Sequence, residues 1–453
     1  MRSPLHAMTT ALVALSLLLA WPLHLAAQER PLALIRDAEI EHILARYANP
    51  VFRAAGLDLG ATRVFIVNDD TLNAFVAGGQ RVFVFTGLIL ATESPRQLVG
   101  VLAHETGHIR GGHLTRTHNA MSDAQTISII AALLGGLAAA ASGNGQAAGA
   151  LIMGGQSAGT QMFLSYSRTQ ESLADQAGAD LMEKAGWSPR GLSEFLGILD
   201  QQELMLGARG NPYFRSHPLS YERIDALEQR VAESPLADKP DPPDLVEAHK
   251  LMQAKLFGFV RDPQQTFRKY PESDLSAPAR YARSVAWMRL ARTDKALQQI
   301  RSLVAEFPTN PYFHELEGQI LLEGGKVSEA QPPLREAYRI EPDPMIAVTL
   351  AQALVAEGRP EADKEAEDLL GAIIQAEPDN AGAWGQLAIV YGRQGEIGKS
   401  MLANGENYFN RGQFEFASEQ VERALRTLKT GTPEYYRALD IQNAIREFRR
   451  RAN

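Results

Sequence analysis

The stretch from Leu98 to His108 reads LVGVLAHETGH, and it contains the most informative residues of the chain. Its apolar first half is typical of a buried helix. On a helix His104 and His108 are four residues apart, so both imidazoles lie on one face and can bind one metal ion. Glu105 lies beside that face, where it can take a proton from a metal-bound water. The stretch therefore predicts a catalytic zinc site with one Zn²⁺ per chain.

The composition restricts how such a site can be built. The chain has 453 residues, 45% of them hydrophobic and 22% charged, which is typical of a globular protein with two to four domains. It has 10 His and no Cys. The absence of Cys excludes disulfides, thiolate zinc sites, iron–sulfur clusters and a Cys nucleophile, so His and carboxylates must hold any metal. The net charge of −8 argues against a nucleic-acid partner.

A catalytic zinc ion needs a third protein ligand, and the sequence offers two candidates. His113 follows the histidine pair closely, but the pattern His-Glu-x-x-His-x-x-Gly-x-x-His requires His at position 114, which is Leu114. The preferred candidate is Glu171, on a helix predicted over 169–185, because two His and one Glu form a common catalytic zinc set. Asp175 lies one turn later on the same face, where it can accept a hydrogen bond from a ligating His.

Elements around these helices are predicted from hydrophobic periodicity. Helices are expected over 36–56, from Ser94 to about Arg110, over 169–185 and over 189–207, and strands over 64–67, 73–76 and 82–85. In the 169–185 helix we expect Leu173, Ala177 and Leu181 to face the core.

The strand at Asn73, Ala74, Phe75 and Val76 is a candidate for substrate binding. An exposed edge strand can pair with the main chain of an extended substrate, with little sequence preference. The alternative is a hairpin with a purely structural role.

The N-terminus has the pattern of a secretory signal peptide over 1–27, with a short basic start, an apolar run and small residues before Gln28. An uncleaved anchor is the alternative, although the apolar run is short of the roughly 20 residues needed to span a bilayer. The Ala/Gly-rich segment 127–161 is interpreted as core helix, mobile lid or membrane contact.

The last half of the chain is predicted to be all helical and repetitive. Residues 233–244 contain four prolines and are interpreted as an interdomain linker. Beyond them, prolines and small residues recur at intervals of 33 to 37 positions: Pro308, Pro342 and Pro378; Gly318, Ala351 and Ala388; Gly325, Gly358 and Gly395. This period resembles the tetratricopeptide repeat, in which small residues allow close helix pairs, and it predicts a protein-binding solenoid over 245–453.

Four groups of residues together resemble the zinc metallopeptidase family of the HtpX and CaaX-prenyl-protease type. They are His104 to His108; Ser167-Arg168, Glu171 and Ala174-Asp175; Asn73-Ala74-Phe75 with Gly78, Val82 and Thr86-Gly87-Leu88; and Ser216-His217-Pro218 with Arg223. The resemblance implies an α+β, mainly helical, zincin-type metallopeptidase domain with a small β-sheet over 28–232. The repeats would follow this domain as an all-α solenoid.

The resemblance also implies roles for the site residues. His104, His108 and Glu171 would bind Zn²⁺, and Glu105 would act as general base and then as acid. His217 and Arg223 are candidates to stabilise the oxyanion. His217 has an alternative role, in which its neutral imidazole occupies the fourth position on zinc and keeps the enzyme latent.

The implied function is a periplasmic zinc metalloendopeptidase that degrades misfolded or stalled envelope and outer-membrane proteins. Its repeats would dock substrate or the outer-membrane β-barrel assembly machinery, and a peripheral membrane contact is left open. A chaperone or scaffold with a latent zinc site is the alternative. A membrane-embedded prenyl-type protease is disfavoured, because the sequence lacks clear membrane spans.

Overall fold

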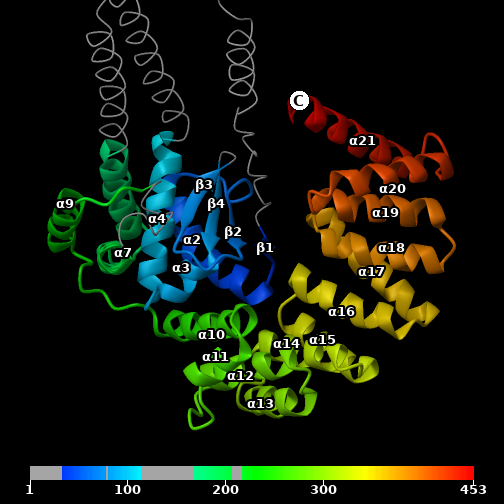
Figure 1. The fold of residues 1–453 in the computed structure, drawn as a ribbon, viewed down its shortest axis with the longest axis horizontal. Helices are drawn as coiled ribbons and strands as arrows, with labels where there is room; N and C mark the ends of the chain where they lie inside the picture. The colour runs from blue at the N-terminus through cyan, green and yellow to red at the C-terminus, as the bar shows by residue number, and fades with distance from the viewer. Residues whose placement is uncertain (1–32, 78–79, 114–167, 207–216, 453) are drawn as a thin grey trace, which may run out of the picture. The chain divides into compact units, whose positions relative to one another are not determined.

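The structure is a computed structural model that describes residues 33–77, 80–113, 168–206 and 217–452 (Figure 1). The predicted signal peptide and the segment 127–161 lie outside these residues. No helix in the described part of the chain is both long and apolar enough to cross a membrane.

A small mixed sheet lies in the first half of the chain, with strand order β1-β2-β4-β3. The strands are β1 (Leu34–Ile35), β2 (Arg63–Val67), β3 (Ala74–Ala77) and β4 (Arg81–Phe85). Strands β2 and β4 are parallel, whereas β1 and β3 pair antiparallel with β2 and β4. Alternation along β4 buries Val82 and Val84 on the core face, whereas Phe83 stacks on Phe65 and Phe75 on the other. All three predicted strands are present, and β1 is an addition.

Helices α2 (Ala38–Ala55), α3 (Thr86–Ala91) and α4 (Pro95–Gly111) pack against the sheet (Figure 1). The other helices of this half are a helix over residues 168–184, α7 (Arg190–Leu206) and α9 (Tyr221–Ala232); α7 packs on α4, and α9 packs on α7.

Helix α4 runs through the core, and nearly all its residues from Pro95 to Gly107 are buried. Ser94 is the N-cap residue as predicted, but its side chain makes no capping bond. The helix ends at Gly112, whose φ of 62° is the left-handed conformation that glycine favours.

The predicted core face of the 168–184 helix is wrong at one position. Leu181 is buried and Ala177 is half-buried, but Leu173 is 53% exposed. The buried face at this level is occupied by the carboxylates Glu171 and Asp175, which are each 2% exposed. Apolar periodicity fails here because polar side chains take the inner positions.

The second half of the chain is helical throughout its described length. Its helices are α10 (Pro243–Val260), α11 (Pro263–Lys269), α12 (Ala277–Arg289), α13 (Thr293–Glu306), α14 (Pro311–Glu323), α15 (Val327–Ile340), α16 (Pro344–Glu357), α17 (Pro360–Ala376), α18 (Ala381–Arg393), α19 (Ile397–Asn410), α20 (Phe414–Thr427) and α21 (Pro433–Ala452). Consecutive helices from α12 onward pack in pairs. The turns at Gly325, Gly358 and Gly395 have φ values of 76°, 73° and 79°. The expected helical pairs are present, and their identity as tetratricopeptide repeats stays a prediction.

Helix α10 connects the two halves of the chain. It begins at Pro243, within the last two residues of the predicted linker, and its Leu245, Met252 and Leu256 belong to the same apolar cluster as α2 and α4. Its Lys255 ammonium lies 2.8 Å from Asp37 Oδ2, at the start of α2. The first core therefore extends past residues 233–244.

Close packing at Gly318 gives a direct test of the helical pairs. A Cβ at Gly318 in α14 would lie 2.3 Å from Leu334 Cγ in α15. We expect Gly318→Ala to lower the free energy of unfolding by about 1–3 kcal/mol, because the pair must separate. Gly371→Ala in α17 is the control, since a Cβ there meets nothing within 4 Å. It should be neutral or stabilise by up to about 1 kcal/mol. Urea unfolding measures both, and equal effects would contradict the close approach.

Candidate metal centre

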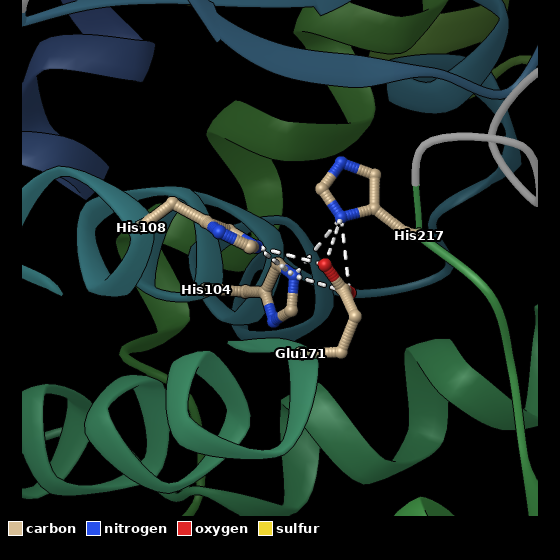
Figure 2. Close-up of side chains that lie close together, drawn as sticks. All are labelled: His104, His108, Glu171 and His217. Carbon is tan, nitrogen blue, oxygen red and sulfur yellow. Dashed lines mark hydrogen bonds and ion pairs between the residues drawn. The ribbon is translucent and has the colours of Figure 1, made fainter. Parts of the chain in front are cut away.

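Three segments bring the predicted site residues together (Figure 2). Helix α4 provides His104 and His108, the 168–184 helix provides Glu171, and His217 comes from the residues that precede α9. One ligand atom from each of these four side chains lies within 4.8 Å of the other three. The set can hold a metal ion, and it contains every ligand predicted from the sequence.

The distances within this set match those around a tetrahedral ion. His104 Nε2 lies 3.1 Å from His108 Nε2 and 3.4 Å from Glu171 Oε2, and His108 Nε2 lies 3.3 Å from Glu171 Oε1. His217 Nδ1 lies 3.3 Å from His104 Nε2 and 3.1 Å from Glu171 Oε2. Ligand atoms at about 2.0–2.1 Å from a tetrahedral zinc are separated by about 3.3 Å. These five separations are therefore compatible with four ligands around one ion, and His217 Nδ1 lies next to His104 Nε2 and Glu171 Oε2 as the fourth ligand atom.

Two glycines allow the ligand-bearing helices to approach closely. A Cβ at Gly107 in α4 would lie 2.8 Å from Ala174 O, and a Cβ at Gly178 would lie 3.1 Å from His104 N. Any larger side chain at Gly107 would push the helices apart and move Glu171 away from the histidines. The sequence pattern does not identify Gly178 as a site of close helix packing, although this glycine lies on the helix that is predicted to carry Glu171.

Asp175 holds His104 in the orientation that metal binding requires. His104 Nδ1 lies 2.9 Å from Asp175 Oδ1, so a proton on Nδ1 leaves the Nε2 lone pair directed at the other ligands. The contact predicted for Asp175 is thus present in the structure.

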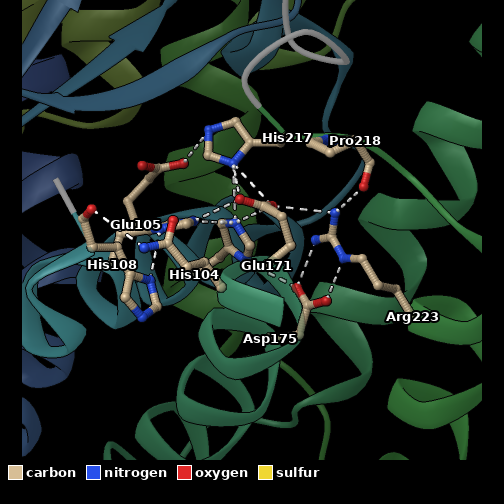
Figure 3. A network of polar contacts seen from close by, with 10 residues as sticks. His104, Glu105, His108, Glu171, Asp175, His217, Pro218 and Arg223 are labelled. Atoms are coloured by element: carbon tan, nitrogen blue, oxygen red, sulfur yellow. Dashed lines mark hydrogen bonds and ion pairs between the residues drawn. The ribbon is translucent and has the colours of Figure 1, made fainter. Parts of the chain in front are cut away.

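Arg223 binds the same carboxylates from the opposite side (Figure 3). Its Nε and Nη2 donate to Asp175 at 2.7 and 2.9 Å, and its Nη1 lies 3.2 Å from Glu171 Oε2. Nη1 also donates to Pro218 O at 2.8 Å. Arg223 therefore connects the 168–184 helix to the segment that bears His217.

His113, the alternative third ligand, lies behind His108. Its Nδ1 is 3.0 Å from His108 Nδ1, and it is outside the set of four ligand groups. A proton shared between these nitrogens leaves His108 Nε2 free to bind a metal. Gly111 makes room for this ring, because a Cβ there would lie 2.3 Å from His113 Nε2.

Glu105 lies beside the ligands without joining them. Its Oε1 is 3.5 Å from His217 Nε2, and this buried oxygen accepts no hydrogen bond in the described part of the chain. A buried oxygen with no donor is available to a water or substrate proton. This position suits the general base predicted from the motif.

The charges of the site are strongly coupled. Burial alone would raise the pKa of Glu171, but the neighbouring His217, His104 and His108 lower it well below its usual value. Burial would lower the pKa of His104, but its hydrogen bonds to Asp175 and Glu171 raise it to about 10. A ligand imidazole must be neutral, so binding of a divalent cation would release the His104 proton.

The predicted substrate strand lies at the sheet edge. Among the described residues β3 pairs only with β4, so its other side is unpaired. Ala74 and Val76 are buried, whereas the Phe75 ring stacks on Phe83. Asn73 precedes the strand, and its carbonyl accepts a hydrogen bond from Phe85 N. Substrate binding at this edge stays a prediction.

The donor set fits zinc. Imidazole nitrogens and a carboxylate oxygen are common zinc ligands, and the separations above match tetrahedral geometry. In such a site His104, His108 and Glu171 would hold the ion.

Replacement of His113 tests its support of His108. We expect His113→Phe, which keeps the ring shape and loses both nitrogens, to weaken zinc binding about 10–100-fold in a chelator competition. His113→Asn should restore part of the affinity, because its amide oxygen can accept the His108 proton. His42→Phe replaces an exposed imidazole outside the ligand set and serves as the control. Unchanged affinity in His113→Phe would show that His108 needs no such support.

Comparison with known proteins agrees with this geometry. Residues 35–231 match the family described as Peptidase family M48. The chain is 26% identical over 381 residues to the beta-barrel assembly-enhancing protease of Escherichia coli (strain K12), covering 81% of this chain and 75% of that protein. It is 24% identical over 408 residues to the protein of the same name from Yersinia pestis, covering 87% and 82% of the two chains. It is also 28% identical over 186 residues to metalloprotease YcaL of Escherichia coli (strain K12), covering 40% and 68%.

The family match covers the residues that form the set of four ligands. Residues 35–231 therefore carry the match to Peptidase family M48, and this match, together with the metalloprotease relatives, supports a metallopeptidase activity.

Proposed function

We propose that this protein is a zinc endopeptidase of the bacterial periplasm that cleaves misfolded or stalled envelope proteins, including outer-membrane β-barrel proteins. The observation that carries the chemistry is the set of four ligand atoms, with Glu105 beside it. The relatives named beta-barrel assembly-enhancing protease support the substrate class.

The proposal assigns a role to each side chain of the site. Zinc held by His104, His108 and Glu171 would polarise the peptide carbonyl and activate a water. Glu105 would accept the water proton and pass it to the leaving amine. His217 and Arg223 are both candidates to stabilise the oxyanion, and the contacts of Arg223 with three acceptors favour a positioning role for it.

We also propose a division of labour along the chain. A signal peptide over 1–27 would direct export, and residues 28–232 would perform hydrolysis. Residues 233–244 would form the linker, and tetratricopeptide-like pairs over 245–453 would bind substrate or the β-barrel assembly machinery. The unpaired edge of β3 would hold the substrate main chain at Asn73 to Val76.

The position of His217 supports a second candidate, a chaperone or scaffold whose zinc site is latent. Its Nδ1 lies at the fourth position of the ligand set, where catalysis requires an open site for water. The two candidates differ in whether Glu105 is needed for the protein's activity in the cell.

Glu105→Gln tests the enzymatic proposal. The variant should retain stoichiometric zinc, because Glu105 is not among the ligands, and it should cleave unfolded casein about 10²–10⁴-fold more slowly. Casein cleavage is measured beside the parent protein at matched zinc content. Equal cleavage by both proteins would exclude Glu105 as the general base, and biological activity that survives in Glu105→Gln would favour the scaffold.

His217→Ala separates the two roles of this histidine. We expect several-fold faster casein cleavage, because removal of the imidazole opens the fourth ligand position to water. Zinc content is measured in parallel, and His314→Ala, which lies outside the ligand set, is the control. Slower cleavage at unchanged zinc content would instead assign His217 to oxyanion stabilisation.

A further inference from the structure

A second concave site lies away from the metal centre, where β1 and the start of α2 meet α10, α14 and α16. Its volume is about 360 Å³, within the range of about 300–1,000 Å³ that ligand pockets have. None of the metal ligands lines it. We name it the junction pocket.

Acidic groups outnumber basic ones at the base of the junction pocket. The Lys255 ammonium, fully enclosed on α10, is shared by three carboxylates: Asp37 at 2.8 Å, Glu39 at 3.4 Å and Glu315 at 3.9 Å. Tyr281 donates a hydrogen bond to Glu39 at 2.7 Å. Asp37 and Glu315 line the pocket itself.

One oxygen of the buried Glu315 carboxylate lacks a hydrogen-bond donor in the part of the chain that the structure describes. The residue is 8% exposed, and its Oε2 accepts no hydrogen bond from the described residues. Lys255 lies at the outer limit of an ion pair, and burial raises the pKa of Glu315 above its usual value. A buried carboxylate oxygen without a hydrogen bond is costly, so a cationic donor that enters the pocket would be stabilised there, and it would favour the ionised form of Glu315.

The basic residue at the pocket does not supply that donor. Arg36 lines the pocket, but its guanidinium is paired with Glu41 at 2.6 Å and Glu377 at 3.3 Å. Glu323 adds a further carboxylate at the rim. The lining therefore offers a ligand more carboxyl groups than cations.

The walls suit a peptide better than a free amine. Leu256, Phe259, Leu322 and Met345 provide apolar surface for the methylenes of a long side chain. Gln319 on α14 and Gln352 on α16 also line the pocket, one position after Gly318 and Ala351. They occupy equivalent places in successive helical pairs, so their amides can bind the main chain of an extended segment.

We propose that the junction pocket binds an extended peptide segment of a partner protein through an arginine or lysine side chain, which donates to Glu315 and Asp37. This inference deepens the docking role proposed above and rests on it, but it concerns binding that needs neither zinc nor hydrolysis.

Two fluorescent peptides test the proposal. They are seven residues long and identical except at the centre, where one has arginine and the other has citrulline, which is similar in shape but uncharged. Binding to the full chain is followed by anisotropy in the Glu105→Gln background, so that neither peptide is cut. We expect the arginine peptide to bind at least about tenfold more tightly, as for a charge-assisted hydrogen bond in a buried site.

Matched variants test whether Glu315 causes the preference for the arginine peptide. Glu315→Gln keeps the shape of the side chain and removes its charge, and it should reduce the arginine preference to less than about threefold. Glu317→Gln is the control, because Glu317 is on the same helix but pairs with Arg301 and does not line the pocket. Gln319→Ala with Gln352→Ala should weaken both peptides equally and leave the preference unchanged.

Three results would overturn the proposal. They are equal binding of the arginine and citrulline peptides, an arginine preference that survives Glu315→Gln, and no arginine binding at about 1 mM. Spermidine distinguishes the two sources of a cation. If spermidine displaces the arginine peptide at equal concentration and the Gln319 and Gln352 changes have no effect, the pocket binds free amines and not peptides. Casein cleavage is measured separately, so these peptide-binding results can be interpreted even if the enzymatic proposal is wrong.

Discussion

The close contact between α4 and the 168–184 helix is the constraint on which the metal centre depends. Each helix contributes ligands, and neither has enough of them alone. Gly107 and Gly178 reduce the separation until a Cβ at Gly107 would collide with the other helix backbone and a Cβ at Gly178 would be in unusually tight contact with it. Because α4 also passes through the centre of the apolar core, its ligand face is fixed by packing on all other sides.

Burial of so many polar groups requires that each has a partner. Arg223 is almost fully buried, and it satisfies Asp175, Glu171 and Pro218 O together. Asp175 in turn orients His104, and His113 stands behind His108 in the same way. Glu105 Oε1 is the exception within the centre, which is consistent with an oxygen that receives its proton during the reaction.

Local sequence patterns predicted the elements and the ligands, and they failed where distant partners decide the outcome. The three strands and α4 follow from alternation, from helical periodicity and from Pro95 at the first turn. The i, i+4 histidine spacing indicated the metal ligands without any tertiary information. Periodicity predicts that Leu173 faces the core because it counts apolar residues and does not register that Glu171 and Asp175 are buried by their partners. The contacts of Arg223 involve residues 48 positions away, so no local pattern could reveal them.

The metal-binding half and the helical second half of the chain are also less separate than a linker at 233–244 suggests. Helix α2 packs on α4 within one core, and its first turn provides Asp37 and Glu39 to the Lys255 cluster. Helix α10 contributes Leu245, Met252 and Leu256 to that same core, although it begins only at the end of the linker. A chain cut after residue 244 would lose these side chains and leave Asp37 and Glu39 without their ammonium partner. Loss of peptide binding in such a fragment could then reflect damage to the α2–α4 core, so point substitutions in the full chain are the sounder way to examine docking.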